Sequence, residues 1–121
     1  MKLTDEAKRD ILNFVLERVA NVANKEYQKR VWIRGDGPEE DSFDDAVCDF
    51  FMECESILER NKDFSLDNLQ YQVLKIFHDE FENFPMRHDW PGDFIDTPEW
   101  EKIIDLAKEV LEGFQYQKKQ S

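Results

Sequence analysis

The chain has 121 residues and a net charge of −12, a length that suits one domain with a sizeable core. Its acidity argues against nucleic acids and anionic membranes as direct ligands, because like charges repel. No run of about 18 apolar residues occurs, so the sequence predicts no membrane-spanning helix.

Apolar residues recur at three- and four-residue spacing in two stretches of the first half, a pattern typical of amphipathic helices. The first predicted helix runs from Asp5 to Asn24, with Thr4 as its N-cap. The second runs from Phe43 to about Arg60, with Ser42 as its cap. Together they predict that the first half of the chain contributes two long helices to the core.

The second half contains two further periodic stretches. A third helix is predicted from Ser65 to about Glu82, and its wide apolar arc predicts that it is the most buried of the four. The fourth starts with Thr97 as cap and Pro98 in the first helical position, and ends near Gly113. We therefore predict an all-α domain over residues 1–121, a bundle of about four helices.

Two long connections separate these helices, at residues 25–41 and 83–97. The second contains Phe84, Trp90 and Phe94, which we expect to pack it down onto the domain. The only cysteines, Cys48 and Cys54, lie too far apart along one helix for a disulfide. Two reduced thiols and a charged N-terminal segment favour a cytoplasmic protein.

The segment Gly35–Glu59 contains ten carboxylates and no Lys or Arg, so it carries −10 of the net charge of −12. Within it, Asp45, Asp49 and Glu53 follow one another at four-residue spacing and are expected to face water together. Like charges at this spacing cost about 0.2–0.5 kcal/mol per pair on a helix. A helix that tolerates this repulsion favours a positively charged partner.

From this segment we predict a protein-binding surface formed by carboxylates with flanking aromatic anchors. Its charged residues are Asp41, Asp44, Asp45, Asp49, Glu53 and Glu55, and its candidate anchors are Trp32 and Trp90. Such carboxylates can occupy the positions that nucleic-acid phosphates would take on a basic protein surface. Their long-range attraction speeds association with that protein.

Signs of catalysis are incomplete. A possible metal cluster is formed by His78, Asp79 and Glu80 with Glu82 and Asp89. HExxH, zinc-finger and EF-hand spacings are all missing from the sequence. Neither cysteine has a neighbouring base, and no GxSxG motif or P-loop occurs. We therefore predict a protein that is not an enzyme, with no catalytic, cofactor or metal residues.

The run RGDGPEEDSFDDAVCDFF, on a small acidic chain, resembles the immunity proteins of bacterial polymorphic-toxin and contact-dependent growth inhibition systems. The likeness covers residues 31–51. It implies a cognate toxin domain, commonly a nuclease, that this chain binds and blocks. Two alternatives stay open: a helical adaptor with a solvated acidic face, and a metal-dependent helical hydrolase.

Overall fold

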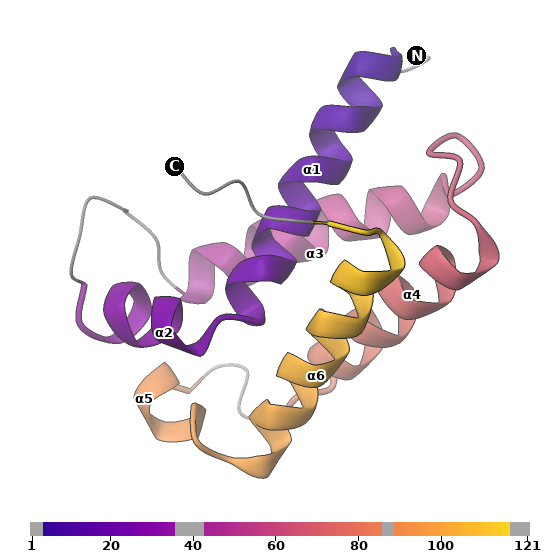
Figure 1. The fold of residues 1–121 in the computed structure, drawn as a ribbon. Helices are drawn as coiled ribbons and strands as arrows, with labels where there is room; N and C mark the ends of the chain where they lie inside the picture. Colours follow the sequence, from indigo (N-terminus) through magenta and orange to yellow (C-terminus); the bar gives the residue numbers. More distant parts are fainter. Residues whose placement is uncertain (1–3, 36–42, 86–88, 117–121) are drawn as a thin grey trace.

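All regular structure in the described part of the chain is helical. The computed structural model describes residues 4–35, 43–85 and 89–116, without the side chains of residues 44–46. The long helices of these ranges are α1 (Asp5–Val22), α3 (Phe43–Glu59), α4 (Asn68–Glu82) and α6 (Pro98–Gly113), and Figure 1 shows their arrangement. The all-α prediction is therefore confirmed for these ranges.

The two long connections contain more structure than the sequence predicts. The first holds α2 (Lys25–Tyr27) and a π-helical segment, η1 (Gln28–Ile33), and the second holds α5 (Pro91–Phe94). The expected count of about four helices is correct for the long ones and omits these short ones. Each is too short to produce a periodic pattern in the sequence.

Side-chain caps fix the starts of the long helices. Thr4 Oγ1 accepts a hydrogen bond from the Ala7 amide at 3.0 Å, and Thr97 Oγ1 accepts one from the Trp100 amide at 3.2 Å. Both caps were predicted, and both satisfy an amide that has no partner within its helix. The predicted cap Ser42 lies outside the described residues.

Helix α4 starts at Asn68 and not at Ser65 as predicted. Asp67 Oδ1 accepts from the Gln70 amide at 2.7 Å, and Gln70 Oε1 accepts from the Asp67 amide at 3.1 Å. This reciprocal capping box satisfies two free amides at once. Ser65 has a φ of 57°, in the left-handed region, so the chain turns there before the helix begins.

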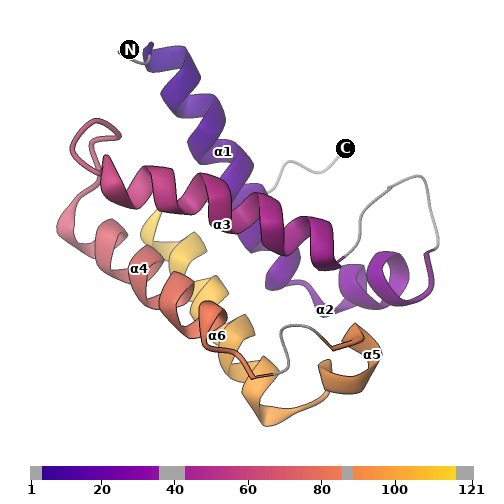
Figure 2. The ribbon, with the colours of Figure 1, turned by 180° about the vertical axis from the view of Figure 1, so that it is seen from behind.

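Helices α3 and α4 form an antiparallel hairpin, seen side by side in Figure 2. Helix α1 packs against α3 and α6, and α4 packs against α3 and α6. Helix α6 lies in front of α3 in Figure 1 and behind it in Figure 2, so these two helices occupy opposite sides of the molecule. Within the described ranges, no helix combines the length and apolar character needed to cross a membrane.

Aromatic rings fill the space between α3, α4 and α6. Phe81 of α4 is 1% exposed, and its ring lies 6.0 Å from both Phe50 of α3 and Trp100 of α6. Trp100 is fully buried and also contacts Phe94, at 4.9 Å between centroids. Aromatic pairs contribute about 0.5–1.5 kcal/mol each beyond their buried area. These rings therefore hold three helices in register.

The predicted degree of burial of α4 is wrong. Leu69 and Ile76 lie on its apolar arc but are 59% and 51% exposed, whereas only Leu74, Phe77, His78 and Phe81 are buried. A helix packed between two neighbours buries only the sides that face them. Helix α1 buries six residues and helix α6 buries five, more than the four of α4.

Gln28 joins the end of α1 to α6 through a fully buried amide. Its Nε2 donates to the carbonyl oxygens of Val22 at 2.6 Å and Asn21 at 3.0 Å, and its Oε1 accepts from Trp100 Nε1 at 3.0 Å. Helix C-terminal carbonyls have no partner within their own helix, and a buried indole N–H also needs an acceptor. One side chain thus satisfies groups on both helices.

We predict that Gln28→Leu lowers the free energy of unfolding by about 2–4 kcal/mol, because buried polar groups of Trp100 and Val22 would lose their partners. Urea unfolding followed by tryptophan fluorescence measures this loss. The matched control is Gln72→Leu, an exposed position on α4, where the change should stay within about 0.5 kcal/mol. Equal losses in the two variants would contradict the role assigned to Gln28.

The two thiols have opposite environments. Cys48 is exposed, whereas Cys54 is fully buried and both are free. Burial raises the pKa of the Cys54 thiol, and the nearby carboxylates of Glu55 and Asp79 raise it further. Cys54 therefore serves as a small apolar residue of the core.

We predict that a thiol reagent labels Cys48 in the folded protein and reaches Cys54 only after unfolding, because the thiolate is the reactive form and Cys54 is shielded from solvent. Mass spectrometry before and after addition of denaturant counts the labels. The Cys48→Ser variant should take no label while folded. Rapid labelling of that folded variant would show that α3 is not packed as described.

Candidate functional site

The described carboxylates of α3 lie on both flanks of its buried stripe and on its outer side. Asp49 and Glu53 are half-buried, and Glu55 and Glu59 are exposed. Met52 lies about one turn from Asp49 and from Glu55 along α3 and is 64% exposed. The outer side of α3 therefore presents negative charge around one flexible apolar side chain, which the sequence analysis did not single out.

Three predicted members of this surface fall beyond what the structure describes. Asp41 lies outside the described residues. Asp44 and Asp45 lie in the first turn of α3, but their side chains are not described. Asp45, Asp49 and Glu53 were predicted to stack at four-residue spacing. The structure defines the exposure of Asp49 and Glu53 among them.

Most ion pairs of the described side chains involve acids outside α3. Lys8 pairs with Asp5 at 3.9 Å, Arg60 with Asp63 at 3.3 Å, Lys75 with Asp79 at 3.2 Å and Lys102 with Glu80 at 3.1 Å, while Lys25 pairs with Asp96 and Glu101. Among described side chains, no Lys or Arg pairs with Asp49, Glu53 or Glu59. The negative charge at these three positions is therefore not balanced by a described cation.

The two predicted tryptophan anchors have different environments. Trp32 is 5% exposed, with its ring centroid 5.4 Å from that of Phe43 and 6.1 Å from that of Tyr27. Its ring belongs to the core and cannot reach a partner while the core stays packed. This corrects the expectation that Trp32 lies on the surface.

Trp90 is the exposed tryptophan of the pair. It is 55% exposed and is the N-cap residue of α5, which packs on η1 at the same end of the molecule as the start of α3 (Figure 2). The indole of Trp90 rests against the backbone at Gly92. A Cβ at this position would lie 2.7 Å from the indole Nε1, so only glycine leaves room for the ring. Phe84 and Phe94 pack the connection down as predicted, whereas the prediction that Trp90 does so is wrong. Trp90 remains a candidate anchor for a partner.

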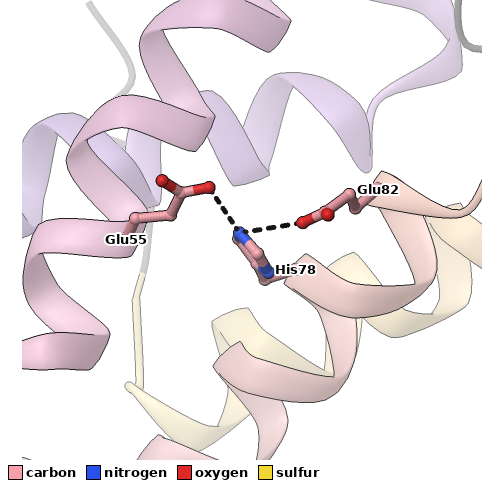
Figure 3. A group of neighbouring side chains, drawn as sticks. All are labelled: Glu55, His78 and Glu82. Atoms are coloured by element: carbon pink, nitrogen blue, oxygen red, sulfur yellow. Dashed lines mark hydrogen bonds and ion pairs between the residues drawn. The ribbon is translucent and has the colours of Figure 1, made fainter.

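Glu55 has a partner within the molecule that the sequence analysis did not identify. Figure 3 shows His78 of α4 directed between Glu55 of α3 and Glu82 of α4. His78 Nε2 lies 3.4 Å from Glu55 Oε1 and 3.7 Å from Glu82 Oε2, and Nδ1 lies 3.0 Å from Asp79 Oδ1. The hydrogen bond with His78 is the main reason that the pKa of Asp79 is lowered, and Lys75 adds to this effect.

Packing explains why this imidazole is buried. The His78 side chain is 9% exposed, and its ring meets Phe51 edge-on at 5.1 Å between centroids. Glu55 follows Phe51 by four residues, so both side chains lie on the side of α3 that faces α4. In the sequence His78 and Glu82 are one helical turn apart, whereas Glu55 is 23 residues from His78, so the sequence gives no sign of this contact.

Comparison of the chain with known protein-family models, curated protein sequences and solved structures found no match.

Proposed function

We propose that this chain is an acidic binding protein whose α3 docks on a positively charged surface of another protein. The observation that carries the proposal is that no described Lys or Arg forms an ion pair with Asp49, Glu53 or Glu59, although five described cations are paired with other acids. Such a surface exerts an unbalanced negative field, which attracts a basic partner and orients it during approach.

Two exposed apolar side chains complement the charge. Met52 lies among the carboxylates and is 64% exposed, and Trp90 is 55% exposed beside α5. Methionine adapts its shape to a partner, and tryptophan is frequent among residues that dominate binding energy. On this proposal the carboxylates steer association, while the two apolar side chains slow dissociation.

Within this class we propose an inhibitory role against a cognate bacterial toxin domain of the nuclease type. Support comes from the resemblance of residues 31–51 to immunity proteins and from the match between carboxylates and a groove that binds phosphates. Blocking such a groove requires only occupancy, so the chain needs no catalytic residues of its own. An adaptor role would use the same α3 surface without inhibiting the partner.

The test uses the protein encoded beside the gene of this chain as the partner. We predict that Asp49→Lys with Glu53→Lys weakens binding at least tenfold, about 1.4 kcal/mol. We also expect association of the unaltered pair to slow as salt rises, because ions screen charges at a surface. Biolayer interferometry measures both, and an assay of the partner's activity separates inhibitor from adaptor.

The matched control is Asp105→Lys with Glu109→Lys, two exposed positions one turn apart on α6, on the opposite side of the molecule from α3. It changes the net charge by the same amount, and we expect less than a threefold loss. Equal losses in both double variants would mean that net charge alone acts. Unchanged binding of the α3 variant would remove these residues from the interface.

A further inference from the structure

We propose that Glu55, His78 and Glu82 bind one divalent transition-metal ion of the Zn²⁺ type. One ligand atom from each of these residues lies within 4.8 Å of the other two, and the three come from the facing sides of α3 and α4 (Figure 3). The proposal does not rest on the proposed function, because it concerns the chain alone.

The spacing of the ligand atoms matches that of a tetrahedral site. Zinc binds imidazole nitrogen and carboxylate oxygen at about 2.0–2.2 Å, which places neighbouring ligand atoms of a tetrahedron about 3.3–3.6 Å apart. The observed separations from His78 Nε2 are 3.4 Å to Glu55 and 3.7 Å to Glu82. The two carboxylate oxygens lie within 4.8 Å of each other, so shifts of up to about 1 Å in two exposed glutamate side chains would complete this geometry.

The other imidazole nitrogen is held as metal sites require. His78 Nδ1 lies 3.0 Å from Asp79 Oδ1. When Nδ1–H donates a hydrogen bond to this carboxylate oxygen, Nε2 carries the lone pair, which faces Glu55 and Glu82. A carboxylate behind a ligating histidine fixes its tautomer and strengthens its donation to the metal.

The electrostatic potential between Glu55, His78 and Glu82 favours a cation. Two carboxylate oxygens and the Nε2 lone pair converge there, and all three carry negative potential. A metal ion at this point relieves their repulsion. Imidazole nitrogen selects transition ions such as Zn²⁺ over Mg²⁺ and Ca²⁺, which prefer all-oxygen ligands.

The position of the cluster suits both entry of an ion and an effect on stability. The Glu55 and Glu82 side chains are 57% and 53% exposed, while the histidine between them is 9% exposed. Three protein ligands leave a fourth position for water. A bound ion would link α3 to α4 and would occupy one oxygen of Glu55, a residue also assigned to the partner-binding surface.

Titration of the metal-free protein with Zn²⁺ by isothermal calorimetry tests the proposal. We expect one ion per chain, and a melting temperature that rises by at least about 5 °C at a hundredfold excess of free Zn²⁺ over its Kd. A chelator should reverse the rise. Both Glu55→Gln and Glu82→Gln, which keep side-chain shape, should weaken binding at least tenfold.

Matched controls separate this cluster from adventitious binding. Glu59→Gln alters an exposed carboxylate one turn beyond Glu55, and His88→Gln alters the chain's only other histidine. Both variants should bind Zn²⁺ as tightly as the unaltered chain. Absence of Zn²⁺ binding, equal weakening by Glu59→Gln and Glu82→Gln, or loss of binding in His88→Gln would overturn the proposal. None of these results depends on the basic partner.

Discussion

The packing of phenylalanine rings between α3 and α4 is the constraint on which the rest of the structure depends. Phe50 of α3 meets Phe77 at 5.2 Å and Phe81 at 6.0 Å, and Phe51 meets Phe81 at 5.4 Å between centroids. Because these rings occupy the inner side of α3, its rotation about its own axis is fixed. The same rotation directs Met52 outward and places Glu55 opposite His78.

The long helices could be predicted from sequence because their boundaries are local. The helix predicted to start at Phe43 does so, and the caps Thr4 and Thr97 need only residues three positions away. Burial of the two tryptophans is not local. Trp32 and Trp90 both lie in connections without a period, and packing against other helices, such as that of Trp32 on Phe43 of α3, decides which of them is buried.

The candidate metal ligands likewise divide into two that local spacing brings together and one that depends on how the helices pack. Spacing along α4 places His78 and Glu82 on one side, one turn apart, but the approach of Glu55 depends on the register of two helices. Likewise, nothing near Gln28 in the sequence indicates that its amide binds the indole of Trp100, 72 residues away. Sequence alone therefore identified the acidic helix but not the residues that face it across the hairpin.

The proposed interface lies on the outer side of α3, where it contacts a basic partner. Hydrogen–deuterium exchange tests this contact most directly when the chain is measured with and without the product of the neighbouring gene. The account predicts added protection in residues 43–59 and around Trp90, with none along the exposed side of α6. Protection centred on α6, or on Leu69 and Ile76 of α4, with α3 unchanged, would contradict it.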